Sequence, residues 1–331
     1  MNRSRYAGRM ASFSATIALA ALILFGFARY DHFLSVYNVT SVLRYNAMFA
    51  LVSLGMCFVI MSGGIDLSVG AVAALGSVAA AMASPHGGFA GLCAGVGVGL
   101  LAGTVNGLLV TRARLLPFIA TLSTMLAANG SALLLAGNQS IAVSYTSGFT
   151  DMGQGDLGPF PVPFLIAAAA YLAGSFVLNL TSVGRTVLAI GGNEEASRLM
   201  GLRADLVKCL VYVGSGGLAG LAGVILASQF GAGQPIEGVG WELFAIASVV
   251  VGGTLLSGGS GSVMATLAGV LLLGVLFNVL NFENGMGWLS LSAYWQSVIR
   301  GIFLLVVVVI QSIHARPAAV ARDEKPLTRP R

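Results

Sequence analysis

Long apolar runs separated by short polar segments make up most of the chain. A transmembrane helix needs about 20 consecutive apolar residues, with a usable range of about 17–25. The third and eighth runs of this chain are short, and each adjoins a glycine-rich break, so either is a candidate half-helix or re-entrant segment. The ten predicted spans are 11–28, 45–62, 70–84, 89–110, 116–136, 161–180, 209–230, 243–257, 262–281 and 294–312. The pattern predicts an all-α, polytopic membrane helix bundle.

The composition agrees with this fold class and excludes an ordinary soluble domain. The chain is 56% hydrophobic and only 9% charged, and its mean hydropathy is +0.89, whereas a soluble domain carries roughly 25% charged residues. The three cysteines show no spacing that predicts a metal site or a disulfide framework. The net charge of +5 comes from basic residues in loops and tails, so it does not indicate nucleic-acid binding.

Basic residues are divided unevenly between the two sides that alternating spans define. If residues 1–10 face the cytoplasm, 14 of the 17 basic residues fall on the inner side. Only Arg29 and Arg44 fall outside, Arg300 lies within the last span, and segment 137–160 contains no Lys or Arg. Because Lys and Arg concentrate in cytoplasmic loops, we expect both termini to be cytoplasmic. The count does not separate eight spans from ten.

These spans define the expected domain organisation. We expect a cytoplasmic N-terminus at 1–10 and a membrane domain at 11–312, with a cytoplasmic loop at 181–208. The remaining residues, 313–331, form a basic tail that we expect to be cytoplasmic and disordered.

Glycines recur every fourth residue within the fourth run, at Gly91, Gly95, Gly99, Gly103 and Gly107. A spacing of four places them on one slowly drifting helix face. Close helix–helix packing is the main interpretation, and a face that lines a pore is the alternative.

Two glycine-rich breaks interrupt the apolar pattern, at 61–70 and 252–261. Each contains a glycine pair, which weakens a helix, and two residues after the pair comes Leu-Ser. Transporter halves can contain paired broken helices of this kind. The broken-helix glycines that we match to one another are Gly63 with Gly252 and Gly64 with Gly253.

Asp66 is an ionisable residue between two apolar runs, and such a residue is a functional candidate by default. It could cap a helix that starts at Leu67 and anchor it, with help from Ser68; it could line the solute path; or it could relay protons. Amide and hydroxyl side chains in other spans suit a neutral, hydroxyl-rich solute, although bonding between helices explains each of them equally well. The pathway candidates are Asp66, Ser68, Asn106, Thr121, Asn129, Gln229 and Asn278.

Seven charged residues stand together in segment 185–208, between long apolar runs. Within it, Asn193 is a good helix N-cap, and Glu194 and Glu195 occupy the first turn, where the helix dipole favours anions. Arg198 follows Glu194 by four residues, in the favourable order for an ion pair.

Gly201 suits the left-handed position that ends such a helix. A helix this short is marginal alone, so segment 193–202 is predicted to dock on a soluble partner. The two lysines do not lie in a P-loop pattern, GxxxxGK[ST], and no other catalytic constellation is present. The chain is therefore predicted to be a transport subunit and not an enzyme, with its energy source elsewhere.

Four stretches of the chain carry a family resemblance, and with their spacing they cover nearly its whole length. They are MSGGIDLSVGAVAALGS at 61–77, PFIATLSTM at 117–125, GRTVLAIGGNEEASRLMGL at 184–202 and ELFAIASVVVGGTLLSGGSGS at 242–262. They resemble the permease subunits of bacterial ABC importers for monosaccharides, of the ribose, xylose and galactofuranose type. The basic, proline-containing tail departs from that pattern.

The resemblance implies a set of partners and a location. A cytoplasmic ATPase, which would hold ATP and Mg²⁺, would dock on the loop around Asn193, Glu194, Glu195, Ala196, Arg198 and Gly201. A second permease copy or a paralogue would complete the path, and a periplasmic binding protein would deliver a pentose or hexose, possibly galactofuranose. The chain would sit in membrane lipid as a multi-pass protein of the bacterial inner membrane, bind no cofactor itself, and work by alternating access.

Two other functions compete with this one on the residues alone. A stand-alone proton-coupled transporter would use Asp66, and a passive channel would be lined by the glycine-rich helices. The sequence names neither the sugar nor the partner permease.

Overall fold

The computed structural model describes residues 2–285 and the helical positions 295, 298, 299, 301, 302, 305 and 309. The chain divides into two compact units, residues 1–282 and residues 283–331. The predicted last span, 294–312, is described only at those positions, and Arg300 and the tail 313–331 lie outside the described residues. The account below concerns the first unit.

Helices make up nearly all of the regular structure in the described part of the chain. The helices are α1 Asn2–Arg29, α2 Val36–Met61, α3 Val69–Ala83, η1 Ser84–His86, α4 Gly88–Thr111, α5 Pro117–Ala136, α6 Asp151–Gln154, α7 Val162–Leu180, α8 Ser182–Gly192, α9 Glu194–Leu199, α10 Ala204–Phe230, α11 Trp241–Val251 and α12 Val263–Gly285. Short antiparallel pairs join β1 Ile141–Ala142 to β4 Ala232–Gly233, and β2 Asp156–Leu157 to β3 Phe160–Pro161.

Seven of the described helices are long and apolar enough to cross a membrane. Two shorter apolar helical stretches accompany them: Ala15–Arg29, which is part of α1, and Trp241–Val251, which is α11. The predicted all-α membrane bundle is therefore confirmed. The predicted short eighth span is the half-length helix α11. The second span begins nine residues earlier than predicted, because Ser35 caps it by accepting a hydrogen bond from Asn38 N–H.

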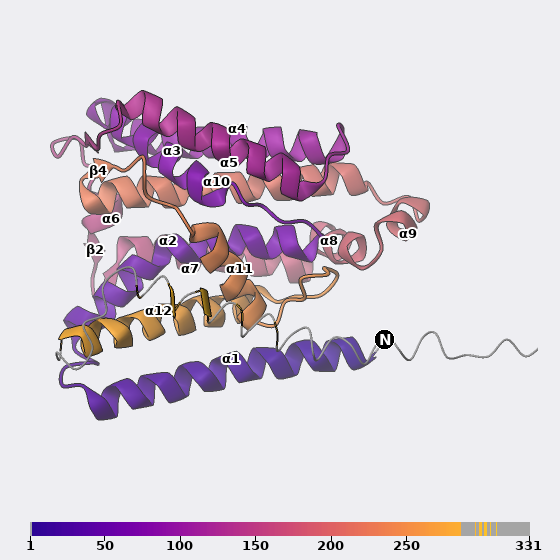
Figure 1. The fold of residues 1–331 in the computed structure, drawn as a ribbon, viewed down its shortest axis with the longest axis horizontal. Coiled ribbons are helices and arrows are strands. Elements are labelled where there is room, and N and C mark those ends of the chain that lie inside the picture. Colours follow the sequence, from indigo (N-terminus) through magenta and orange to yellow (C-terminus); the bar gives the residue numbers. More distant parts are fainter. Residues whose placement is uncertain are drawn as a thin grey trace, which may run out of the picture. The chain divides into compact units, whose positions relative to one another are not determined.

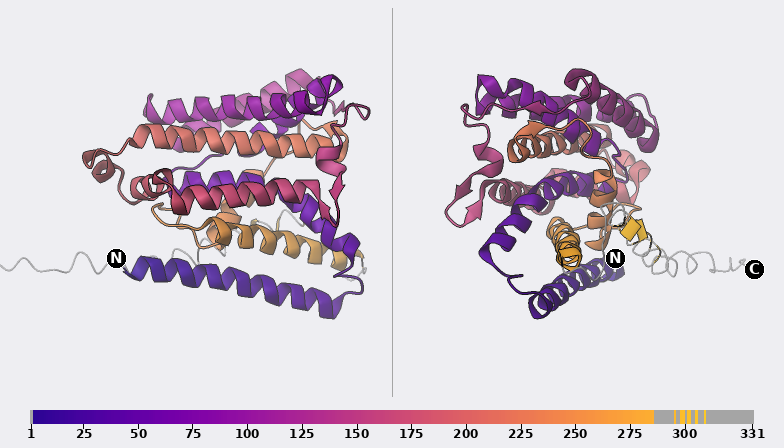
Figure 2. Two further views of the ribbon diagram at one scale, coloured as in Figure 1. Left: turned by 180° about the vertical axis from the view of Figure 1, so that it is seen from behind. Right: turned by 60° about the vertical axis from the view of Figure 1, so that its left-hand side comes forward.

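The long helices of the first unit run side by side, and its two ends differ (Figure 1). At one end, α8 and α9 protrude; at the other lie α6, β2 and β4. The view from behind shows the same arrangement (Figure 2). The N-terminal end of α1 lies at the α9 end (Figure 1).

Glycine contacts allow α10 to lie backbone to backbone against α4. The five predicted glycines of α4 are all buried. A Cβ added at Gly99 would lie 2.9 Å from Gly220 Cα and would also collide with the carbonyl of Gly216, both on α10. Small residues permit this close approach in lipid, where van der Waals contact drives helix association. The packing interpretation of the glycine pattern is confirmed.

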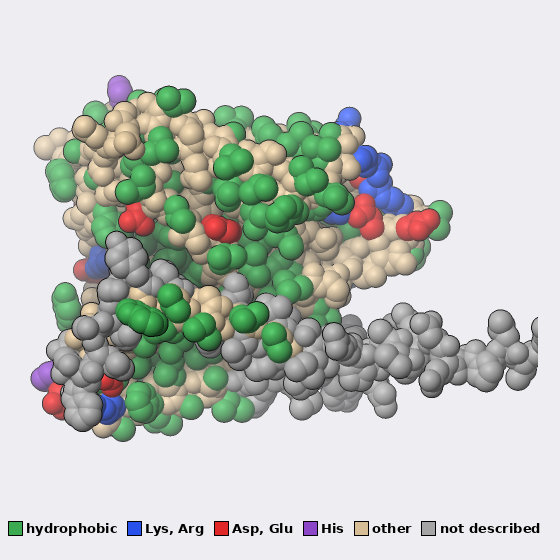
Figure 3. All heavy atoms as spheres, viewed as in Figure 1, with side chains coloured by type: hydrophobic (Ala, Val, Ile, Leu, Met, Phe, Trp, Pro, Cys, Tyr) green, Lys and Arg blue, Asp and Glu red, His purple; other side chains and the backbone are tan. Residues whose placement is uncertain are grey.

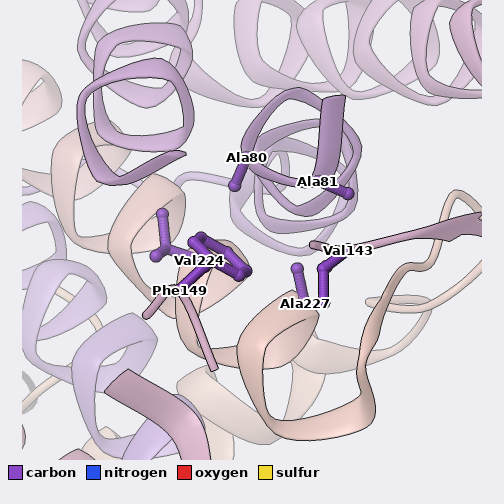
Figure 4. Packing of buried hydrophobic residues seen from close by; sticks show 6 residues of the cluster. All are labelled: Ala80, Ala81, Val143, Phe149, Val224 and Ala227. Atoms are coloured by element: carbon purple, nitrogen blue, oxygen red, sulfur yellow. The ribbon is translucent and has the colours of Figure 1, made fainter. Parts of the chain in front are cut away.

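A small hydrophobic cluster lies at the end of the unit opposite α9. Val143 and Phe149 come from the segment between α5 and α6, and they lie against Ala80 and Ala81 of α3 and against α10 (Figure 4). The α10 members of the cluster are Val224 and Ala227. This cluster fixes the segment between α5 and α6 on α3 and α10.

Replacing Gly99 with alanine tests whether α10 depends on this close approach. We expect Gly99→Ala to destabilise the protein by about 1–3 kcal/mol, because an extra methyl group in a tight contact forces backbone shifts. The matched control is Gly97→Ala on the same helix, where an added Cβ meets nothing within 4 Å. Thermal melting of both variants in mild detergent measures the difference, and equal melting temperatures would contradict the packing role.

Candidate functional site

The charged segment folds into α9, which protrudes between α8 and α10. Asn193 caps α9, since its Oδ1 accepts a hydrogen bond from the Ala196 N–H at 2.9 Å. Gly201 ends the turn with φ +79°, in the left-handed region. The Leu202 N–H donates to the Ser197 carbonyl at 3.1 Å, which closes the helix end. The predicted helix, its cap and its terminating glycine are confirmed, whereas the helix α8 before it was not predicted.

An ion-pair network ties α9 to the first turns of α10. The Arg198 guanidinium donates to Glu194 at 2.7 Å and to Asp205 at 2.8 Å. The Lys208 ammonium donates to the second oxygen of Glu194 at 2.7 Å. Arg114, before α5, lies 3.6 Å from Asp205. The predicted pair of Glu194 and Arg198 is therefore confirmed and belongs to a larger network.

This network shifts the ionisation of its members. Burial of the Glu194 carboxyl opposes its ionisation, but hydrogen bonds from Lys208 and Arg198 outweigh that effect and lower its pKa. Hydrogen bonds to Asp205 and Glu194 raise the pKa of Arg198. A lowered carboxyl pKa contributes stability above the pKa of an unfolded glutamate, and that stability is lost as the pH falls through the lowered value. Glu194 and Arg198 therefore both stay charged at neutral pH.

The tip of α9 combines these charges with exposed apolar side chains. Leu199 is 84% exposed and Met200 is 69% exposed. Charged side chains gather at this end of the unit, whereas hydrophobic side chains spread over the sides of the helices (Figure 3). Exposed apolar side chains beside charged ones suit a protein–protein contact, where an apolar area is buried next to polar groups.

The first predicted break is a helix end of the Schellman type. The Gly63 N–H donates to the Ile60 carbonyl at 2.9 Å, and the Gly64 N–H donates to the Val59 carbonyl at 3.0 Å. Gly63 has φ +79°, which only glycine adopts without strain. The motif satisfies the last carbonyls of α2 inside the protein.

The second break repeats this motif at the end of α11. The Gly253 N–H donates to Val250 at 2.9 Å and the Thr254 N–H donates to Val249 at 3.1 Å, with Gly253 at φ +87°. Gly63 is therefore equivalent to Gly253. The predicted match of Gly63 with Gly252 was wrong by one residue. The hydrogen bonds at the two helix ends show which glycines are equivalent, whereas the shared Leu-Ser pair aligns the two breaks one residue away.

Asp66 joins three helices just after the first break. Its carboxylate accepts hydrogen bonds from the Ser68 N–H at 3.0 Å, the Ser68 hydroxyl at 2.6 Å and the Ser215 hydroxyl at 2.9 Å. Asn106 of α4 donates to the Ser68 hydroxyl at 2.8 Å. The sequence predicted that the helix starts at Leu67, but α3 begins at Val69.

Asp66, Ser68 and Asn106 are fully buried or nearly so. Their contacts are those of an anchor, which was part of one interpretation of Asp66. The predicted cap was wrong, because Ser68 is the N-cap of α3 and no side chain caps that helix. The other pathway candidates lie apart from this cluster: Thr121 and Asn129 on α5, Gln229 near the end of α10, and Asn278 on α12. Asn278 exchanges side-chain hydrogen bonds with Asn38, at 3.1 and 2.9 Å.

A non-helical segment at 234–240, which sequence reasoning missed, runs along α3 to the start of α11. Gln234 N–H donates to the Ser77 hydroxyl at 3.0 Å, and Gly238 lies against the Gly70 carbonyl. The segment therefore runs from Ser77 toward the N-terminal end of α3. The clustering of Pro235, Gly238 and Gly240 was the available signal.

An aromatic contact places the end of this segment beside the middle of α2. The Trp241 ring lies 4.8 Å from the Phe49 ring, and Phe49 is near the middle of the 26-residue helix α2. Glu237 is exposed on the segment, while Glu242 is partly buried and accepts a hydrogen bond from the Gly240 N–H at 3.3 Å. The Glu237 carboxylate thus lies on non-helical backbone four residues before a ring that contacts the middle of α2.

Metal ligation finds no support in the part of the chain that the structure describes. In that part, no three His, Cys, Asp or Glu side chains come close enough to hold a metal ion.

Comparison with known proteins agrees with this architecture. A family described as the permease component of branched-chain amino acid transport systems matches residues 38–308. The ribose import permease protein RbsC of Bacillus subtilis is 38% identical over 311 residues, which cover 93% of this chain and 95% of the relative. RbsC of Haemophilus influenzae is 38% identical, with coverage of 88% and 90%. The L-arabinose transport system permease protein AraH of Escherichia coli is 35% identical, with coverage of 80% and 79%. No solved structure matches the chain.

Arg198 and Arg203 offer a matched test of the network. Arg198→Ala removes the cation between Glu194 and Asp205, so we expect faster amide hydrogen exchange across 194–202. Because each partly exposed pair is worth only about 0.2–1 kcal/mol, the global melting temperature should change little. Arg203→Ala is the control, since Arg203 is exposed and has no ion pair within the described residues. Equal exchange in both variants would show that the network does not hold α9.

Asp66→Asn tests the anchor against the proton relay. We expect a lower melting temperature, with a loss on the order of 3 kcal/mol, because buried hydroxyl and amide donors lose a charged acceptor. Asp31→Asn, at an exposed position, should melt like the wild type. An Asp66→Asn protein of wild-type stability that no longer supports uptake would instead favour the relay.

Proposed function

This chain belongs to the ABC-importer permease family that includes the ribose and arabinose import permeases, and we propose that it carries a monosaccharide through the membrane by alternating access. It is a transport subunit of a sugar importer and not the ATPase. The observation that carries the proposal is α9, a capped and charged helix that protrudes from the bundle with an apolar tip.

We propose that a cytoplasmic ATPase subunit docks on α9 and holds ATP and Mg²⁺ itself. Asn193, Glu194, Glu195, Ala196, Arg198 and Gly201 would form or support the contact. The exposed Leu199 and Met200 give the partner an apolar anchor. The network through Asp205 and Lys208 supports the transmission of force, since it links α9 directly to the long helix α10.

The orientation that fits this docking places the α9 end of the first unit in the cytoplasm. Arg112, Arg114, Arg203 and Lys208 belong to the loops and helix ends near α9, whereas segment 137–160 has no Lys or Arg. This asymmetry agrees with a bacterial inner-membrane protein with cytoplasmic termini. A periplasmic binding protein would then meet the opposite end, near α6 and β2.

A pentose or hexose is the proposed solute, with galactofuranose among the candidate sugars. The family description names branched-chain amino acids, but relatives that align over most of this chain are named for ribose and arabinose. Non-helical backbone at membrane depth is tolerated where it is buried in protein or lines a watery cavity. The exposed segment with Glu237, which leads into Trp241 beside the middle of α2, therefore supports a place beside the path, which a second permease copy or a paralogue would complete.

A proton-coupled transporter that uses Asp66 is not favoured. The Asp66 carboxylate already accepts three hydrogen bonds from Ser68 and Ser215, and it is fully buried. These contacts serve an anchor better than a relay, which needs access to water and to a second proton carrier.

Purification of the tagged chain from its native membranes tests the proposed machine. In mild detergent, we expect a P-loop ATPase to co-purify in stoichiometric amount, together with a second permease if the assembly is a heterodimer. Leu199→Asp should abolish this recovery by placing charge at the apolar tip, whereas Leu157→Asp should not. Leu157 is 69% exposed but lies on β2, outside the candidate spans and at the end of the unit opposite α9. Recovery of the chain alone, even after cross-linking, would contradict the proposal.

A further inference from the structure

The end of α2 and the connection from α11 to α12 meet at the C-terminal end of α8, which lies just before the Asn193 cap of α9. The carbonyl of Met61, at the end of α2, accepts a hydrogen bond from the Gly259 N–H at 3.0 Å. A Cβ added at Gly258 would lie 2.9 Å from the Gly63 nitrogen and 3.1 Å from Gly191 Cα. We call the contact of Met61, Gly63, Gly191, Gly258 and Gly259 the glycine junction.

Gly191 occupies the centre of the glycine junction. A Cβ at this position would collide with both the Met61 carbonyl and the Gly259 nitrogen. The three chain segments therefore touch through backbone atoms, with no side chain between them. Figure 1 shows the ends of α2 and α8 and the connection from α11 to α12 converging where α9 protrudes.

Such a contact transmits displacement because it contains no side chain that could change its conformation. Side-chain contacts can absorb a small movement by changing rotamer, whereas packed backbones must move together or separate. Helix α8 spans 11 residues and is joined to α9 through Asn193 alone. Only Gly192 and Asn193 therefore separate Gly191, in the glycine junction, from the first residue of α9.

The segment beyond the first break is held from the other side. Asp66 is bonded to Ser215 of α10, and Ser68 is bonded to Asn106 of α4. Along the chain, Gly63 and Gly64 lie between Asp66 and Met61, whose carbonyl is bonded within the glycine junction. The first break thus has one fixed side and one side that follows α8, which is the arrangement of a hinge.

We propose that the glycine junction delivers the movement of α9 to both broken helices at once, and that Gly191 is the residue that positions them. This inference rests on the proposed function, since it assumes that a partner displaces α9. It adds that one contact displaces the end of α2 and the connection that follows α11 together, so that the two breaks open and close as a pair.

Gly191 and Gly192 provide a matched test within one helix turn. Gly191→Ala inserts a methyl group into the glycine junction, whereas a Cβ at Gly192 meets nothing within 4 Å. Both changes favour the helix equally. The assembly with its ATPase and binding protein is reconstituted in liposomes, and a mixture of labelled ribose, arabinose and allose is the probe.

We expect the sugar imported per ATP hydrolysed to fall by roughly five- to tenfold in Gly191→Ala, the range of a typical coupling between sites. ATP hydrolysis should continue, and Gly192→Ala should match the wild type. A wild-type ratio in Gly191→Ala would overturn the inference. A wild-type assembly that imports none of these sugars with ATP would instead contradict the proposed function.

Amide hydrogen exchange of the wild-type assembly keeps the inference testable if Gly191→Ala does not fold. We expect exchange at Gly259 to differ between the nucleotide-free assembly and the one bound to a non-hydrolysable ATP analogue. Exchange at Val110, on the packed helix α4, should not differ. Unchanged exchange at Gly259 would show that the junction does not move with the ATPase.

Discussion

Backbone contact at glycine is the interaction on which this structure depends. In lipid, helices gain little from burying apolar surface, so their association relies on close van der Waals packing. Gly99 and Gly103 of α4 lie against the backbone of α10 because neither carries a side chain. The same device recurs at Gly191, where three segments meet without side chains. It makes a rigid frame in the first case and a transmitting contact in the second.

The polar groups of the bundle interior are arranged around this frame. Both broken helices end in motifs that satisfy their own carbonyls, at Gly63 and at Gly253. Asp66 then fixes the start of α3 to α10 and, through Ser68, to α4. Irregular backbone thus lies within the bundle while the carbonyls bonded in these two motifs are satisfied by the protein, as a low-dielectric surrounding requires.

Much of this organisation could be predicted from the sequence, because local rules decide it. The apolar run lengths predict the spans, and the N-cap Asn193, the pair of Glu194 with Arg198 and the terminating Gly201 predict α9. The spacing of the glycines predicts a packed face of α4. Each of these features depends on residues close together in the chain.

Features that depend on distant contacts could not be predicted in the same way. The hydrogen bonds of Gly253 and Thr254 determine which glycine of the second break matches Gly63. The Leu-Ser pair that both breaks share suggested a different alignment. The links from Arg198 to Asp205 and from Lys208 to Glu194 need the fold that returns α10 beside α9. The segment at 234–240 enters the bundle because Gly238 fits against Gly70, a contact between residues far apart in sequence.

The central claim is that this chain converts ATP hydrolysis on another subunit into movement of a sugar. Uptake by liposomes that contain the purified permease tests it most directly, with the ATPase and binding protein either present or absent. The account predicts uptake that requires ATP and both partners and does not respond to an imposed proton gradient. Uptake by the permease alone, driven by that gradient, would contradict it.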